Sequence, residues 1–352
     1  MKKLYAIITC ALVVLTLIGF MYLNEFSVWY HTSIVVKNPK IVSASTKKKH
    51  EGTSTMKVQP NGVPGEQSKC VDDGDRYSQV KFFVLFIGYS RSGSTLLGSL
   101  LDAHPNVIVA NEYGVGDKLS TFTAAKKNRN YLFNQLYNNS QWYATKSYRS
   151  STYRGVYNYH VPKQWQGKYN CSIQVIGDKK AVQSVRTFSD EEGDQRLNEL
   201  GRIVKVPIKF VHIHRNPFDT IATMLLQHKN ARSQATSSHF KPLNDQKELR
   251  RCVNRYLNRV KRLEAIKAKR VEDVVDIEYS KLVKEPKQIA KKLCKFFQLT
   301  CSRKYVKSFA KKTYHNETYT RRKVIWTEDM KARVFNKMNL LSPHRKFVFE
   351  VS

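Results

Sequence analysis

The sequence is short of acidic side chains. Its 352 residues contain 28 Asp and Glu against 61 Lys and Arg, which leaves a formal net charge of +33. This surplus does not specify a fold, but it predicts a surface that attracts nucleic acid, lipid headgroups, phosphorylated cofactors or acidic glycans. Hydrophobic residues make up 41% of the chain, enough to build the core of one large domain or two modest ones.

Two other signals are missing. The chain has no internal repeat, and no spacing of His, Cys, Asp and Glu stands out as a set of metal ligands. We therefore expect chemistry that runs without a metal.

Long apolar runs are also scarce, and the longest lies at the N-terminus. Lys2 and Lys3 precede the uncharged stretch Leu4–Leu23, which is about long enough to cross a thin bilayer as a helix. Positive charge before the stretch predicts a cytoplasmic N-terminus and a lumenal remainder. A cleaved signal peptide is the alternative, but no clear small-x-small cleavage site follows. Either interpretation sends the chain into the secretory pathway and excludes nucleic acid as its partner.

Composition divides the rest of the chain. Residues 24–80 are polar and contain Lys47–Lys49 followed by Gly, Pro and Ser, which predicts a flexible stem. Residues 81–352 form the predicted catalytic domain. The triplets at Asn138, Asn170 and Asn316 are weak predictions of glycosylation.

Cysteines are few but suit an oxidising lumen. Five lie beyond Cys10, so at least one is free or pairs with another chain. Cys294 and Cys301 flank a predicted helix end and are close enough to bridge, and a Cys171–Cys252 pair is a guess.

Strands and helices alternate after residue 81. The run "KFFVLFIGYS" is continuously apolar, as in a strand buried on both faces, and "STLLGSLLDAH" has one apolar helical face. A second strand and helix lie in "IKFVHIHRNPFDTIATMLLQH", where Asn216 is a good N-cap and Pro217 suits the first turn. A third strand, "VVDIEY", precedes a helix from about Pro286 to Phe297. This alternation predicts a single α/β, P-loop-like domain with a mostly parallel central sheet flanked by helices.

The segment from Tyr131 to Tyr169 breaks this alternation because it is rich in Tyr and Trp among Asn, Gln and Ser. It is either a long insertion pinned to the domain surface by its aromatic residues, or part of an acceptor site.

The strongest motif joins the first strand to its helix. Gly88-Tyr-Ser-Arg-Ser-Gly93-Ser94-Thr95 has the spacing G-x-x-x-x-G-x-[ST], whose backbone N–H groups and helix N-terminus bind anions. A loop that binds nucleotide triphosphates needs Lys where this chain has Ser94. In this chain the basic residue of the loop comes earlier, at Arg91, and this position suits a shorter, diphosphate-like group. A P-loop kinase is therefore disfavoured.

At this point the sequence resembles the sulfotransferases that use 3′-phosphoadenosine 5′-phosphosulfate (PAPS). The stretch "GYSRSGSTLLGSLLDAHPNV" is similar to their 5′-phosphosulfate loop, and "DAHP" is closest to Golgi tyrosylprotein and carbohydrate members. The resemblance covers roughly Lys81 to Leu299. It implies PAPS as co-substrate, no metal, and a Golgi membrane protein of single-pass type II with a lumenal catalytic domain. It implies PAPS contacts from Arg91, Ser92, Gly93, Ser94 and Thr95.

The second strand–helix unit resembles the family's 3′-phosphate element. The resemblance places the phosphate ligands at Arg215 and Thr223, where the family more often has Ser at the second position. An arginine can bind a phosphate through two hydrogen bonds.

Three residues carry the predicted catalysis. Arg91 is the candidate on the leaving-group side, and Lys179 in "VIGDKKA" resembles a lysine of Golgi relatives, with Lys180 as its alternative. Glu112 in "VIVANEYG" resembles the base of tyrosylprotein sulfotransferases, although its spacing from the loop is one residue long. His104 is the rival base, and an alternative role for it is to cap the first helix.

Basic residues gather near the C-terminal end. From Lys281 to Lys312 there are eleven of them against one acid, Glu285. They form either a solvated face or an electrostatic track for an anionic polymer such as a glycosaminoglycan. The element "YTRRKVIWTE" is a candidate to close over the cofactor.

The predicted activity is transfer of a sulfuryl group from PAPS to an acceptor hydroxyl, on a glycan or glycosaminoglycan. The alternatives are a protein-tyrosine sulfotransferase and a non-catalytic relative that binds PAPS or glycans. The expected partners are PAPS, the anionic glycan or protein acceptor and the membrane, and a second copy of the chain is allowed.

Overall fold

The computed structural model describes residues 76–146, 149–151, 155–157, 159–161, 164, 172–231, 239–314 and 316–349. The predicted membrane span Leu4–Leu23 and all but the last residues of the predicted stem lie outside these ranges. No helix among the described residues is long and apolar enough to cross a membrane.

A five-stranded parallel sheet forms the centre of the fold, with strand order β2-β5-β1-β6-β7. The strands are β1 (Phe82–Ile87), β2 (Val107–Asn111), β5 (Val175–Lys179), β6 (Ile208–His214) and β7 (Val274–Glu278). A short antiparallel pair, β3 (Arg149–Ser151) and β4 (Gly155–Tyr157), lies outside the sheet.

Helices connect the strands. The α-helices are α2 (Ser94–Asp102), α3 (Val115–Leu119), α4 (Arg129–Lys146), α5 (Ala181–Phe188), α6 (Gly193–Val204), α7 (Pro217–His228), α8 (Gln246–Ala268), α9 (Tyr279–Lys284), α10 (Pro286–Phe296), α11 (Arg303–Lys312) and α12 (Glu328–Leu341). Short 3-10 turns are η1 (Ala124–Lys126), η3 (Val271–Asp273) and η4 (Thr320–Lys323).

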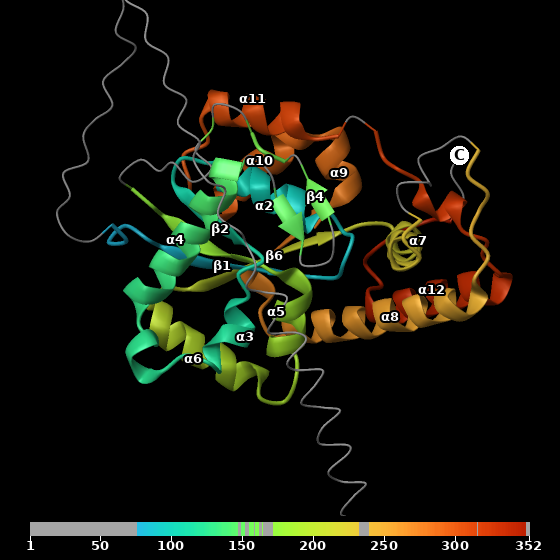
Figure 1. Ribbon diagram of the computed structural model, residues 1–352, viewed down its shortest axis with the longest axis horizontal. Helices are drawn as coiled ribbons and strands as arrows, with labels where there is room; N and C mark the ends of the chain where they lie inside the picture. The colour runs from blue at the N-terminus through green and yellow to red at the C-terminus, as the bar shows by residue number, and fades with distance from the viewer. Residues whose placement is uncertain are drawn as a thin grey trace, which may run out of the picture. The chain divides into compact units, whose positions relative to one another are not determined.

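Both faces of the sheet are buried. Along β1, Phe83 and Leu85 enter a core shared with α3–α8 and α12, whereas Phe82 and Val84 enter a second core shared with α2 and α9–α11. Figure 1 shows α2, α9, α10 and α11 on one side of the strands, and α3, α5, α6 and α8 on the other. Side chains alternate across a strand, so a strand covered on both faces must be apolar at nearly every position, as "FFVLFI" is.

The predicted α/β fold with a parallel sheet flanked by helices is confirmed. The three predicted strands are β1, β6 and β7, and the predicted C-terminal helix is α10. The Asn216 side chain accepts a hydrogen bond from the Phe218 N–H at 3.0 Å, so this residue caps α7 as expected. Apart from α2, α7 and α10, the α-helices were not predicted from the sequence, and the long α8 and α12 are among those missed.

The aromatic segment begins as a helix. Leu132, Phe133 and Leu136 of α4 are fully buried in the core beside β2, while Trp142 is 49% exposed. Part of the insertion therefore packs on the sheet edge. Most of its remainder lies outside the described residues.

The packed part of the chain extends upstream of the boundary predicted at residue 81. Tyr77 is buried against Phe133, with ring centroids 5.2 Å apart, and its hydroxyl donates to the Asn134 side chain at 2.6 Å. Val80 is also buried.

The cysteines meet one expectation and contradict another. Cys294 and Cys301 form the predicted disulfide. Cys252 is a free thiol on the buried face of α8, so the guessed Cys171–Cys252 pair is wrong. Cys171 itself lies outside the described residues. Of the predicted glycosylation sites, Asn138 and Asn316 are exposed and Asn170 lies outside the described residues.

Candidate active site

The glycine-bearing loop turns from the carboxyl end of β1 into α2. Its backbone has positive φ at Gly88 (149°), Arg91 (71°) and Gly93 (105°). A Cβ at Gly93 would lie 3.0 Å from the Tyr279 ring in a backbone conformation that L side chains rarely adopt, so the loop requires glycine there. The Ser92 hydroxyl donates to the Tyr89 carbonyl at 3.0 Å and fixes the turn.

The N-terminus of α2 has no side-chain cap. Gly93 is its N-cap residue, and no acidic side chain lies in its first turn. The first N–H groups of a helix have no partner inside the helix, and its dipole favours an anion at this end. The loop can therefore receive an anionic group, as its sequence predicts.

Lys179, Glu112 and Thr95 form one hydrogen-bonded group. Lys179 Nζ lies 2.5 Å from Glu112 Oε1 and 3.2 Å from Thr95 Oγ1. Lys179 is the last residue of β5, Glu112 follows β2, and Thr95 lies in the first turn of α2. The three residues meet because β2, β5 and β1 are neighbours whose carboxyl ends share one edge of the sheet.

Exposure differs sharply within this group. The Lys179 side chain is 1% exposed and that of Glu112 is 21% exposed. A buried ammonium requires a charged or polar partner, and here the carboxylate supplies it. The lysine is therefore held inside while the carboxylate remains open to an incoming molecule.

Asp178 braces the turn that carries Glu112. Its Oδ1 accepts from the Tyr113 N–H at 3.0 Å, and its Oδ2 accepts from the N–H groups of Gly114 at 2.8 Å and Val115 at 3.1 Å. Glu112 itself has a φ of 59°. Burial raises the pKa of Asp178 to about 6. This role was not predicted from the sequence, in which an acid at the end of an apolar strand is the only signal for it.

Arg215 and Thr223 form a second group on the other side of the loop. Arg215 Nη2 donates to Thr320 Oγ1 at 2.9 Å, and Thr223 Oγ1 lies 3.0 Å from the same oxygen. Arg215 also donates to the Thr318 hydroxyl at 2.9 Å and lies over the Tyr279 ring. The two predicted phosphate ligands thus converge on one point.

The element "YTRRKVIWTE" lies against this group. Arg321 is buried and pairs with Asp219 at 2.5 Å, while Arg322 is exposed. The Trp326 ring packs edge-on against Phe218 of α7, with centroids 5.2 Å apart. The segment that we expected to close over the cofactor is thus fixed beside Arg215 and Thr223 by a buried ion pair.

The remaining predicted residues are placed as follows. Arg91 is half-buried within the loop, and Arg259 of α8, which the sequence analysis missed, donates to the Ser90 hydroxyl at 3.2 Å. His104 Nδ1 accepts from the Asn106 N–H at 3.1 Å, and Nε2 lies 3.1 Å from the Thr300 carbonyl oxygen. Burial lowers the pKa of His104. Both of its ring nitrogens thus contact backbone atoms of the segments that follow α2 and α10.

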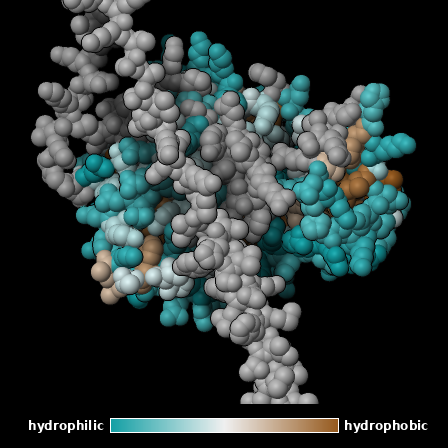
Figure 2. Space-filling model, in the orientation of Figure 1, coloured by the Kyte–Doolittle hydropathy of each residue, from teal (hydrophilic) through white to brown (hydrophobic). Residues whose placement is uncertain are grey.

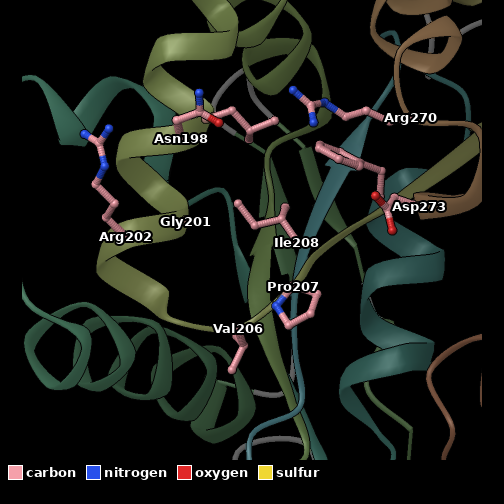
Figure 3. A pocket seen from close by; sticks show the side chains of 10 residues that line it. Asn198, Gly201, Arg202, Val206, Pro207, Ile208, Arg270 and Asp273 are labelled. Carbon is pink, nitrogen blue, oxygen red and sulfur yellow. The ribbon is translucent and has the colours of Figure 1, made fainter.

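An open groove of about 550 Å³ lies at the opposite, amino edge of the sheet. Its lining includes Ile208 at the start of β6, and Arg202 and Arg270 lie around it (Figure 3). Arg270 pairs with Asp194 at 2.7 Å. The groove is therefore separate from the candidate active site. Among the described residues, no group of three His, Cys, Asp or Glu could hold a metal ion.

Comparison with known proteins identifies the family. Residues 84–303 match the Sulfotransferase family, which is more than half of the chain. The chain therefore belongs to the sulfotransferases. No curated protein matches it.

Solved sulfotransferase structures also resemble it. STF9 from Mycobacterium avium is 10% identical, over 74% of this chain and 76% of that one, with a TM-score of 0.40. The sulfotransferase domain of a Synechococcus olefin synthase is 12% identical, over 75% and 95%, with a TM-score of 0.41. Mouse sulfotransferase SULT7A1 complexed with PAP is 11% identical, over 75% and 85%, with a TM-score of 0.39. These likenesses are too weak to carry an argument about substrate.

Proposed function

We propose that this chain transfers the sulfuryl group of PAPS to a hydroxyl of an anionic glycan. The observation that carries the proposal is the contact of Lys179 with both Glu112 and Thr95, where the glycine-bearing loop ends and α2 begins. This arrangement provides a cation, a carboxylate and a helix N-terminus at one edge of the sheet.

Binding of PAPS is divided between the glycine-bearing loop and the pair Arg215 and Thr223. The N–H groups at the start of α2, with Ser92, Gly93, Ser94 and Thr95, would receive the 5′-phosphosulfate. Arg215 and Thr223 would receive the 3′-phosphate, and the support for this pairing is that both already reach the Thr320 hydroxyl.

Glu112 is the proposed base. As the acceptor oxygen bonds to sulfur, the bond between sulfur and the phosphate oxygen breaks, and 3′-phosphoadenosine 5′-phosphate (PAP) leaves. The acceptor proton goes to the Glu112 carboxylate, which is the more exposed member of its pair. His104 is not adopted as the base because both of its ring nitrogens already contact backbone atoms, those of Asn106 and Thr300.

Lys179 and Arg91 are the proposed cations. Each would stabilise negative charge on the oxygen that leaves with the phosphate. The buried position of Lys179 supports this role, because an ammonium is worth more where water is excluded.

The net charge of +33 supports an anionic glycan as acceptor. We also propose a single-pass type II Golgi protein, with an anchor at residues 1–23, then a stem, then a catalytic domain. The predicted boundary between stem and domain at residue 81 moves upstream to include the buried Tyr77 and Val80. Retention in membranes after alkaline wash, with glycan on Asn138, Asn170 or Asn316, would support this topology. A secreted product that begins after residue 23 would contradict it.

The deciding experiment is transfer of labelled sulfate from PAPS to a panel of glycans and tyrosine peptides. We expect labelled glycans with the wild type and the exposed-acid control Asp117→Asn, and greatly reduced labelling with Glu112→Gln. Labelling of tyrosine peptides alone would identify the other acceptor class. Binding of PAP without any transfer would indicate a non-catalytic relative.

A further inference from the structure

Two neighbouring helices carry basic residues and no acids. Within α10 (Pro286–Phe296) and α11 (Arg303–Lys312) every charged side chain is Lys or Arg. These residues are Lys287, Lys291, Lys292, Lys295, Arg303, Lys304, Lys307, Lys311 and Lys312. All but Lys312 are exposed.

The charges follow regular stripes. Lys287, Lys291 and Lys295 are four residues apart on α10, and Arg303, Lys307 and Lys311 repeat this spacing on α11. Four residues rise about 6 Å along a helix, so each stripe spans about 12 Å. Like charges at this spacing destabilise a helix. A face built only for solvation would be more stable with acids interspersed.

No carboxylate within the described part of the chain forms an ion pair with these six stripe residues. Lys281 and Lys284 of the adjacent α9 differ, because they pair with Glu278 at 3.8 Å and Glu317 at 3.5 Å. The stripes therefore present positive charge that no carboxylate among the described residues neutralises.

The two helices are fixed to each other and to α2. The Cys294–Cys301 disulfide joins α10 to the turn before α11. The Tyr305 hydroxyl donates to the Leu100 carbonyl of α2 at 3.1 Å. Figure 1 shows α10 and α11 together on the α2 side of the sheet, and Figure 2 shows hydrophilic residues at the edge of the molecule over α11. The stripes thus have a defined spacing before any partner binds.

This surface leads to the candidate active site. The short helix α9 directly precedes α10 in the chain. Its first residue, Tyr279, lies beside Gly93 of the loop and under Arg215. Lys284 pairs with Glu317, in the segment that contacts Arg215 through Thr318. A chain bound along α10 and α11 would therefore lie next to elements of the transfer site.

We infer that the exposed stripes of α10 and α11 are a docking surface for a linear anionic glycan. This inference rests on the proposed function and assigns the surface to the polymer beyond its reacting hydroxyl. Repeated, separate charges suit an extended polymer, whose contacts add through multivalency, better than a single small anion. Continuity with the active-site elements favours an acceptor glycan over a membrane surface.

The test compares two triple variants of the full chain. Lys287→Gln/Lys291→Gln/Lys295→Gln removes one stripe. Lys247→Gln/Lys261→Gln/Lys337→Gln removes three exposed lysines from α8 and α12, which cover the other core. Immobilised heparin is the probe, at 0.15 M and higher salt. Each exposed charge contact is weak, but the stripe variant loses three of them. We therefore expect it to bind heparin at least about fivefold more weakly than wild type, and the control variant to change little.

Kinetics provides a second measurement. With a polymeric acceptor, the stripe variant should show a raised KM and an unchanged kcat, and its activity on a short acceptor should match wild type. Equal weakening of heparin binding in both triple variants would overturn the docking surface and leave a general effect of charge. Loss of binding to phosphatidylserine vesicles, with heparin binding intact, would instead identify a membrane surface and also overturn it. If wild type transfers no sulfate to any acceptor, the proposed function fails, while heparin binding still decides whether the surface exists.

Discussion

At the scale of single residues, the contact between Glu112 and Lys179 makes the sharpest prediction. Replacing Glu112 with Gln keeps the shape of the side chain but removes its charge and its capacity to take a proton. We expect turnover to fall about 10²–10⁴-fold, with PAP affinity nearly unchanged. Arg91→Ala should damage both binding and turnover, because its charge acts on the bound and the reacting cofactor alike.

Single-turnover rates with labelled PAPS, together with calorimetric PAP binding, measure both effects. The control is Asp117→Asn, an exposed acid of α3 whose pairing with Arg186 is loose, at 3.6 Å. Near-normal sulfation by Glu112→Gln would remove Glu112 from the mechanism.

Arg215 makes a prediction about cofactor selectivity. If it holds the 3′-phosphate, the wild type should bind PAP much more tightly than AMP. Arg215→Ala should weaken PAP binding at least about tenfold, because a hydrogen bond to a charged group is worth roughly 1.5–3 kcal/mol. AMP binding should change little.

Calorimetry with both nucleotides decides the matter. Arg202→Ala is the matched control, because this exposed arginine lies by the groove at the opposite edge of the sheet. Equal affinity of the wild type for PAP and AMP would exclude a 3′-phosphate site at Arg215.

At the scale of elements, the turn between β2 and α3 depends on Asp178. Three N–H groups of this turn donate to its carboxylate. We expect Asp178→Ala to lower kcat about tenfold or more through misplacement of Glu112, because an error near 1 Å in a reacting group is costly. PAP affinity should change much less.

The comparison that separates positioning from general damage is with Asp178→Asn. The amide keeps one acceptor oxygen for the turn, so turnover should recover in part. A purely structural role would lower the melting temperature and PAP binding together, and Asn would then rescue both or neither.

Elements also show which predictions from sequence succeed. Strand β1, the loop after it and the Asn216 cap of α7 were predicted because each depends on neighbouring residues in the chain. The brace from Asp178 to Gly114 was not, because the two residues are 64 positions apart. The convergence of Arg215 and Thr320 spans 105 positions and has no local signal.

At the scale of the whole molecule, a buried polar network joins the sheet to the C-terminal segment. His212 of β6 lies 2.6 Å from Asp276 of β7, which pairs with Lys267 of α8 at 2.7 Å. Arg345, after α12, pairs with Glu264 of α8 at 2.9 Å and lies 3.6 Å from Asp276. The network adjoins the glycine-bearing loop, since a Cβ at Gly88 would approach the His212 ring to 3.3 Å.

This network predicts a loss of stability in acid. Burial lowers the pKa of His212 from its usual 6.5 to about 4. His212 therefore binds a proton less readily in the folded state than in the unfolded state. Its contribution to the free energy of unfolding is fully present above pH 6.5. The free energy of unfolding should fall as the pH drops from about 6.5 towards 4, by on the order of 3 kcal/mol for this residue.

Denaturant unfolding between pH 4 and pH 7.5 measures the slope. His212→Gln should flatten it, although burial also lowers the pKa of His214 and that residue will keep part of the slope. The exposed control His228→Gln should follow wild type. Identical slopes for wild type and His212→Gln would contradict the assignment, whatever their absolute stabilities.

By itself, the sequence determined the class of fold, the glycine-bearing loop after β1 and the family of the chain. Each of these depends on short-range patterns: apolar runs, glycines at fixed spacing, and an arginine and a threonine one strand and one helix further on. The resemblance also identified Glu112 and Lys179 as separate candidates, and only the structure showed that they touch.

The tertiary structure alone decided which side chains meet. It made Cys252 a buried free thiol and Asp178 a brace, and it used both ring nitrogens of His104 in packing. It also turned a run of Lys and Arg residues into two stripes on neighbouring helices that a disulfide links. The physical reason is that contact, burial and pKa depend on neighbours brought together by folding, and these neighbours lie far apart along the chain.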